Sequence, residues 1–122
     1  MSLKNAIYIK DGHKSNGEVV DFAAAILDGV KKGETRDHKR LPRGRWMGVA
    51  KDGQVFGRVM LGEPYMITKD MPEYRDAMIA GTEYDIKPRQ PKYYYPVRRV
   101  EDFRNDPKPI VRHGVYAQYE ED

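Results

Sequence analysis

The sequence predicts an α+β domain in which about six short strands form a small closed sheet flanked by two short helices. Three observations predict this class: several β-branched and aromatic runs bounded by turn residues, one clear amphipathic helix pattern and one weaker helix pattern. The length of 122 residues suits one ordinary domain and one core. We therefore expect residues 1–122 to form a single domain, with residues 119–122 as a short frayed tail.

The strand predictions rest on residue type and on the turns between the runs. Asp52-Gly53 is a hairpin signal between two apolar runs, because both residues tolerate the backbone of a tight turn. Pro96 cannot donate to a sheet ladder, so it favours an edge position or a bulge in its strand. The predicted strands are residues 4–10, 46–50, 54–61, 64–68, 92–100 and 114–119, with a further short basic strand beginning after residue 29.

Two helices are predicted. The first covers residues 18–28: Ser15 and Glu18 have capping-box spacing, and Gly29 is a good C-terminal stop. Its apolar face has helical spacing and consists of Val19, Phe22, Ala23 and Ile26. The second helix covers about residues 71–80, with Asp70 as its cap and Pro72 in its first turn.

Composition excludes several classes of protein and site. Hydrophobic residues make up 39% of the chain and charged residues 34%, and no apolar run approaches the roughly 20 residues of a membrane-spanning helix. There is no cysteine, hence no disulfide, zinc finger or thiol nucleophile. The three histidines, His13, His38 and His113, have no metal-ligand spacing, although His38 can line a cleft beside Arg36. We expect no cofactor, no metal and no membrane partner, and a cytoplasmic location by default.

The net charge of +3 is unevenly distributed. Residues 31–45 contain seven basic and two acidic residues, a net charge of +5, and residues 87–112 contain eight basic and three acidic residues, also +5. Two interpretations stay open: the fold brings the two segments into one phosphate-attracting patch, or both are solvated faces.

One motif follows the first predicted helix directly. Residues 29–36 have the form Gly-x-Lys-x-x-Glu-x-Arg, with Gly29, Lys31, Glu34 and Arg36 at the four defined positions. In this arrangement the sequence resembles the ASCH domain family of the PUA-like superfamily, whose hallmark is this motif in this place. About three quarters of the chain can be followed in this way, and residues 63–91 are the least similar part.

The resemblance implies a fold and a kind of ligand. ASCH domains fold as a small PUA-like β-barrel flanked by helices, with a cleft beside the motif and RNA or nucleotides as suspected ligands. Some small bacterial members are amidohydrolases that remove the acyl group of N4-acetylcytidine.

The residue types of the motif are suited to an ionic cluster. Arg36 can hold Glu34 or a phosphate in bidentate geometry. Lys31 is expected to reach into a cleft without being needed for packing, as a phosphate contact or as a lysine of lowered pKa that acts as a base. The alternative is that Glu34 and Arg36 pair only to close the barrel mouth.

The sequence departs from the amidohydrolase members at one position. Their nucleophile is a threonine three residues after the motif lysine, and here that position is Glu34, which cannot serve as an activated hydroxyl. Thr35 is adjacent, but on a strand its side chain is expected on the opposite face. The resemblance also implies a carboxylate from the region before the aromatic strand, for which Glu73 and Glu83 are both candidates.

Further candidate binding residues come from a turn and from the aromatic strand. Arg40, Arg43 and Arg45 surround a turn that can hold a phosphate or be a solvated loop. Tyr94 is the candidate for stacking on a base, although core packing is expected for at least two of the three consecutive tyrosines. Trp46 is expected in the core. The remaining candidate binding residues of the aromatic strand are Arg98 and Arg99.

The leading hypothesis is a module that binds RNA or a modified nucleotide through a basic cleft around the motif. The alternative is a small hydrolase, of the N4-acetylcytidine amidohydrolase type or RNA-cleaving, with Lys31 and Glu34 as its catalytic groups. A third hypothesis is a protein-interaction module that uses only the fold. The missing threonine disfavours the hydrolase.

Overall fold

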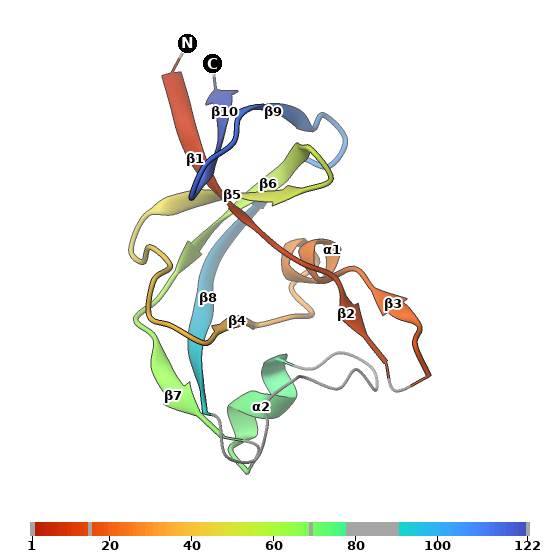
Figure 1. Cartoon of the computed structure of the whole chain (residues 1–122), viewed down its shortest axis with the longest axis vertical. Coiled ribbons are helices and arrows are strands. Elements are labelled where there is room, and N and C mark those ends of the chain that lie inside the picture. The colour runs from red at the N-terminus through yellow and green to blue at the C-terminus, as the bar shows by residue number, and fades with distance from the viewer. Residues whose placement is uncertain (1, 15, 69, 78–90, 122) are drawn as a thin grey trace.

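Five strands close into a barrel at the end of the molecule where the two termini lie side by side (Figure 1). The computed structural model describes residues 2–14, 16–68, 70–77 and 91–121. Within the barrel the neighbours run β6–β5–β1–β10–β9, and a pairing of β6 with β9 closes the ring. The barrel strands are β1 (Ser2–Tyr8), β5 (Trp46–Lys51), β6 (Gln54–Leu61), β9 (Lys108–Arg112) and β10 (Ala117–Glu121). The structure therefore confirms a small closed barrel with few short helices.

A second layer of strands extends away from the barrel along β8 (Lys92–Asp102). The C-terminal half of β8 pairs with β6, and its N-terminal half lies between β4 (Gly33–Arg36) and β7 (Tyr65–Ile67). β8 is therefore not the edge strand that Pro96 allowed. The bulge alternative is the correct one, because Met60 pairs with Arg99 but Leu61 pairs with Val97, which leaves one extra residue on β8.

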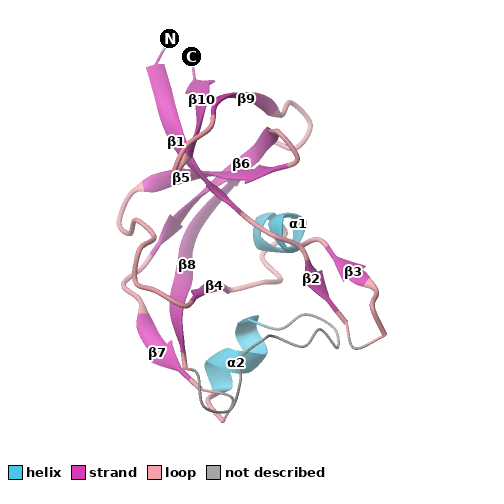
Figure 2. Cartoon of the chain, viewed as in Figure 1, coloured by secondary structure: helices cyan, strands magenta, loops and turns pink. Residues whose placement is uncertain are grey.

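In the described part of the chain, the short helices α1 and α2 flank the strands (Figure 2). α1 covers Phe22–Leu27 and α2 covers Pro72–Ala77, and at six residues each they are too short to cross a lipid bilayer. Asp21, not the predicted Ser15–Glu18 pair, caps α1: its side chain accepts a hydrogen bond from the Ala24 amide.

The residues before α1 form a small hairpin of β2 (Gly12–His13) and β3 (Val19–Val20) instead of a first helical turn. Val19 consequently lies exposed on β3, whereas the other three residues of the predicted apolar face, Phe22, Ala23 and Ile26, are buried. Residues 78–80 of the second predicted helix lie outside the described residues.

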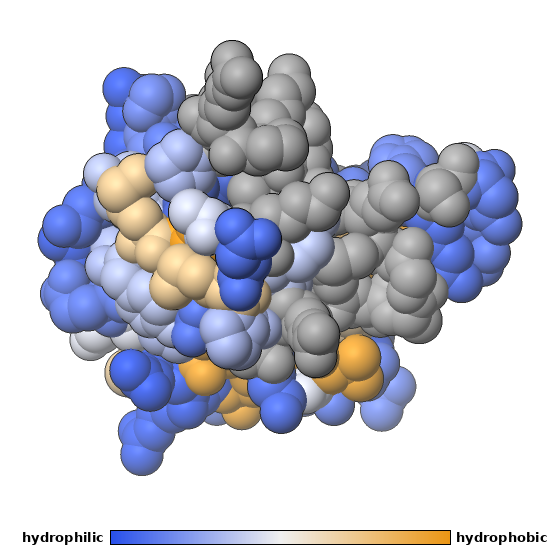
Figure 3. All heavy atoms as spheres, turned by 90° about the horizontal axis from the view of Figure 1, so that it is seen from below, coloured by the Kyte–Doolittle hydropathy of each residue, from blue (hydrophilic) through white to orange (hydrophobic). Residues whose placement is uncertain are grey.

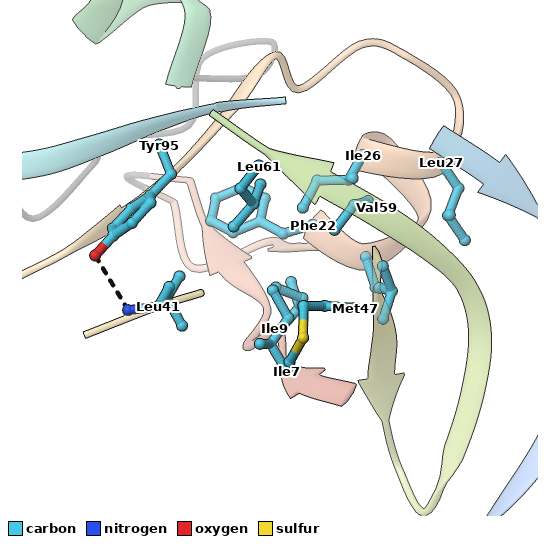
Figure 4. Packing of buried hydrophobic residues seen from close by; sticks show 12 residues of the cluster. Ile7, Ile9, Phe22, Ile26, Leu27, Leu41, Met47, Val59, Leu61 and Tyr95 are labelled. Atoms are coloured by element: carbon cyan, nitrogen blue, oxygen red, sulfur yellow. Dashed lines mark hydrogen bonds between the residues drawn. The ribbon is translucent and has the colours of Figure 1, made fainter. Parts of the chain in front are cut away.

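The main core lies between α1, the barrel strands and β8. Figure 4 shows Phe22, Ile26 and Leu27 of α1 facing Met47 and Val59 of the barrel, with Tyr95 at the far side. The Tyr95 hydroxyl accepts a hydrogen bond from the backbone N–H of Leu41, which attaches the loop between β4 and β5 to the core. A separate small cluster fills the barrel itself and consists of Ala6, Ala50, Val55, Ala117 and Tyr119.

The three consecutive tyrosines 93–95 alternate between the two faces of β8 and pack into two different cores. Tyr95 is fully buried in the main core and Tyr93 packs against it, while Tyr94 points to the other face of β8 and packs with Ile67 and Tyr74. On the side of the molecule shown in Figure 3, the described surface is largely hydrophilic, with apolar side chains in small patches.

The C-terminal strand corrects one boundary prediction. Residues 119–121, expected to fray, belong to β10 and pair with the first residues of β1. The pairing of β10 with β1 extends to the last residues of the strand, because Ser2 and Leu3 lie opposite Glu121 and Glu120.

Candidate functional site

The motif begins where α1 ends. Gly29 has a φ of +76°, a conformation that favours glycine, and its N–H donates to the Ile26 carbonyl. The Val30 N–H reaches back to the Ala25 carbonyl, so the helix ends in a Schellman motif. The Lys31 N–H donates to the same Ala25 carbonyl at 3.0 Å. The backbone of Lys31 is therefore anchored to the end of the helix.

The Lys31 side chain is fully buried, with an exposed fraction of 0%. Its Nζ lies 4.4 Å from the centroid of the Phe22 ring, a cation–π geometry. Burial lowers the pKa of Lys31 to about 8, against an opposing effect of the nearby Glu34 carboxylate. The expectation that Lys31 reaches into an open cleft without a part in packing is wrong, because the side chain folds inward beneath the helix.

β4 carries the rest of the motif. Gly33 lies opposite Pro96, and a Cβ there would lie 2.2 Å from atoms of the Tyr94 ring, so the close approach to β8 requires glycine. Glu34 and Arg36 lie on one face of the strand, as expected, with Arg36 Nη1 3.2 Å from Glu34 Oε2. The exposed fractions of their side chains are 6% for Glu34 and 31% for Arg36.

Each group of this ion pair has further partners. Glu34 Oε1 accepts a hydrogen bond from the Thr35 N–H at 2.9 Å. Arg36 Nη2 donates to the Tyr8 carbonyl at 2.9 Å, which joins β4 to the end of β1. The pair is therefore held in one orientation, with the carboxylate inside and the guanidinium half-exposed.

A hollow of about 440 Å³ opens beside this pair. Its walls combine apolar and aromatic side chains with a few charged groups, a composition typical of small-molecule sites. The lining residues are Ile7, Tyr8, Lys10, Asp11, Phe22, Glu34, Thr35, Arg36, Leu41, Val115 and Tyr116. Lys31 lies behind this wall, in contact with the Phe22 ring.

The predicted arginines of the turn divide into two groups. Arg40 lines a second hollow next to the first. Arg43 is paired with Glu63, with Nε 3.1 Å from Oε1, and Arg45 is exposed away from both hollows.

The aromatic strand contributes less to the site than predicted. Tyr94 has an exposed fraction of 3%, so its ring cannot stack on a base, which corrects its assignment as a binding residue. Arg98 and Arg99 are exposed but line neither hollow. Trp46, expected in the core, is half-buried, with the Arg58 guanidinium 4.4 Å from the centroid of its ring.

The remaining candidates lie around the edges of the site. Glu73, on α2, is half-buried, and its Oε2 atom is buried without a hydrogen-bond partner in the described ranges. Glu83 lies outside those ranges. His38 lines the second hollow, and His113 Nδ1 lies 2.9 Å from the Tyr8 hydroxyl. Among the residues described, no three His, Asp or Glu side chains gather as metal ligands do.

The sequence alone does not predict most of the residues that line the first hollow. Val115 and Tyr116 belong to the loop before β10, and Tyr8 ends β1, so more than 100 residues separate them along the chain. Only Phe22 and the motif residues gave a signal, through helical spacing and the motif itself. The pairing of β1 with β10 brings Tyr8 close to Val115 and Tyr116, and no local sequence pattern predicts this pairing.

Comparison with protein-family models, with curated proteins and with solved structures finds no significant match.

Proposed function

We propose that this chain is a PUA-like domain of the ASCH type that binds RNA or a modified nucleotide in the hollow beside Glu34 and Arg36. The observation that carries the proposal is the position of these two motif residues: both line the one hollow that also receives an aromatic ring from α1. All four motif positions match the family pattern, and the motif follows a short helix packed on a closed barrel.

The chemistry of the hollow suits a nucleobase. A carboxylate held as Glu34 is can accept hydrogen bonds from ring N–H and amino groups. The rings of Phe22, Tyr8 and Tyr116 supply apolar surface for a planar ligand, and the volume of about 440 Å³ lies within the usual range for small-molecule sites.

The proposal is tested by isothermal titration calorimetry with the four common ribonucleosides, N4-acetylcytidine and a mixed RNA pool. We expect binding of at least one nucleoside and RNA binding that weakens as salt rises, because bound phosphates release counterions. Glu34→Gln keeps the shape of the side chain but removes its charge, and should abolish nucleoside binding. Glu101→Gln, which alters an exposed pair with Arg58, is the matched control. No binding of any nucleoside or of RNA at low salt would overturn the proposal.

One observation favours a second candidate, a small amidohydrolase. Burial lowers the pKa of Lys31 to about 8, the range in which a lysine can act as a general base near neutral pH, but the side chain is fully buried behind the wall of the hollow and would have to be uncovered to act there. Because Glu34 replaces the nucleophilic threonine, we expect little release of acetate from N4-acetylcytidine. Robust release by the wild type, abolished in Lys31→Ala, would place hydrolysis ahead of binding.

A further inference from the structure

A second hollow lies next to the first, and the two share part of their lining. It has a volume of about 320 Å³ and is lined by Asp37, His38 and Arg40 in addition to four residues of the first hollow. The shared residues are Arg36, Leu41, Val115 and Tyr116. The two hollows are therefore adjacent, and we call them the first and the second chamber and both together the groove.

The chambers differ in charge. The first contains the carboxylates of Asp11 and Glu34, each already beside a cation: Lys51 Nζ lies 2.8 Å from Asp11 Oδ1, and Arg36 pairs with Glu34. In the second chamber the carboxylate is Asp37, which lies 2.7 Å from Lys92 Nζ.

Arg40 is the exposed cation that remains in the second chamber. Within the described ranges it has no ion pair, and an imidazole, His38, lies in the same wall. The chamber therefore offers a guanidinium and a second nitrogen donor to an anion.

The segment that carries these donors is fixed at both ends. The Tyr116 hydroxyl donates to the Arg40 carbonyl at 3.2 Å, and the Leu41 N–H donates to the Tyr95 hydroxyl at 3.1 Å. At the other end Arg36 is bonded to the Tyr8 carbonyl. A ligand anion meets a backbone that is already in place, which reduces the ordering cost of binding.

We infer that the ligand is a phosphorylated nucleoside, with the nucleoside in the first chamber and its phosphate in the second, where Arg40 and His38 contact it. This inference rests on the proposed function, because that function supplies the nucleoside. A guanidinium binds a phosphate through two parallel charge-assisted hydrogen bonds, and a neutral ligand would leave Arg40 unused. The phosphate belongs either to a free mononucleotide or to an RNA chain, and the two sources share this chemistry.

The test compares each ribonucleoside with its 5′- and 3′-monophosphate by calorimetry. We expect at least one monophosphate to bind about tenfold or more tightly than its nucleoside, the factor that one good charge-assisted contact provides. Arg40→Gln should remove this gain, so that the variant binds the monophosphate no more tightly than it binds the nucleoside. Arg45→Gln is the control, because it removes one positive charge from the same turn outside both chambers.

The outcomes separate this inference from the proposed function. Nucleoside binding without a gain from phosphate overturns the inference and leaves the proposed function standing, whereas no binding of nucleoside or nucleotide overturns both. If Arg40→Gln and Arg45→Gln lose the same amount of affinity for the monophosphate, the phosphate responds to the general positive charge of the turn. That result would contradict a phosphate site in the second chamber. A mixed hexaribonucleotide pool that binds more tightly than every mononucleotide identifies RNA as the source of the phosphate, and the reverse order identifies a free nucleotide.

Discussion

The two basic segments of this chain carry the same net charge, +5 each, and have different structural roles. Residues 31–45 contribute a buried lysine, a half-buried ion pair and an exposed arginine to the walls and support of one groove. In the described part of the second segment, residues 91–112, the cations pair with nearby carboxylates or lie exposed outside both hollows. Arg104 pairs with Asp28 and Asp102, and Lys108 pairs with Asp106.

In these two segments, burial and pairing of the cations decide which side chains form the groove, and the number of charges does not. Arg36 is partly buried, and its guanidinium contacts three acceptors: the carbonyls of Thr35 and Tyr8 and the carboxylate of Glu34. A cation held in this way can orient a neighbouring group. A cation on an exposed strand beside its own counter-charge contributes little beyond solubility. Three stability measurements test this difference between the two segments.

The largest effect is expected for Arg36→Ala in the first segment. The substitution removes the cation that is paired with Glu34, whose side chain is only 6% exposed. We expect the free energy of unfolding to fall by about 3–4 kcal/mol, near the lower end for a broken buried pair because Arg36 is partly exposed. Urea denaturation at neutral pH measures the loss. A loss below about 1 kcal/mol would mean that water reaches Glu34 and that the pair is not a fixed feature of the site.

The next effect is a dependence of stability on pH that comes from Lys31. Its pKa is about 8 in the folded chain and 10.5 ordinarily, so between these values the unfolded chain binds more protons than the folded one. Stability should therefore rise with pH in this window, by about 2 kcal/mol between pH 8 and pH 10. Lys31→Met fills similar volume and cannot titrate.

The measurement is the difference in unfolding free energy between wild type and Lys31→Met at several pH values. The difference isolates Lys31 from other groups that titrate in alkali, among them Tyr119, whose pKa burial raises to about 12. Parallel curves of unfolding free energy against pH for the two proteins would mean that burial does not lower the pKa of Lys31.

The smallest effect is expected in the second segment, for Arg104→Ala. Both carboxylates that Arg104 contacts remain a third or more exposed, Asp28 at 49% and Asp102 at 37%. We expect a loss below about 1 kcal/mol that shrinks further in 1 M salt. A loss as large as that of Arg36→Ala would remove the contrast between the two segments.

Local chemistry made part of this structure predictable. Asp52-Gly53 predicts the β5–β6 hairpin, and both residues have positive φ, 51° and 79°, as a type I′ turn requires. Gly29 predicts the end of α1 for the same kind of reason. The spacing of Glu34 and Arg36 predicts their pairing, because residues two apart on a strand share a face.

The rest depended on contacts between distant parts of the chain. β9 was not predicted, since Lys108–Arg112 has little apolar alternation of its own and is a strand because it pairs with β6 and β10 to close the barrel. The sequence alone allows Tyr94 to face the site, because a tyrosine in a strand can lie on either face and only the packing of β7 and α2 decides which face is buried. The sequence predicts Lys31 in a cleft because this residue stands just past the end of the helix, and no local pattern reveals that its Nζ contacts the Phe22 ring.

If the ligand binds in the groove, its binding should change the environment of the residues that line that groove. Amide chemical shifts of ¹⁵N-labelled protein, titrated at low salt with an equimolar mixture of the four ribonucleoside 5′-monophosphates, measure this change. We expect the largest changes at Tyr8, Thr35, Arg36 and Tyr116, which line the first chamber. Changes centred on Arg98 and Arg99 instead, or no changes in any amide, would contradict this expectation.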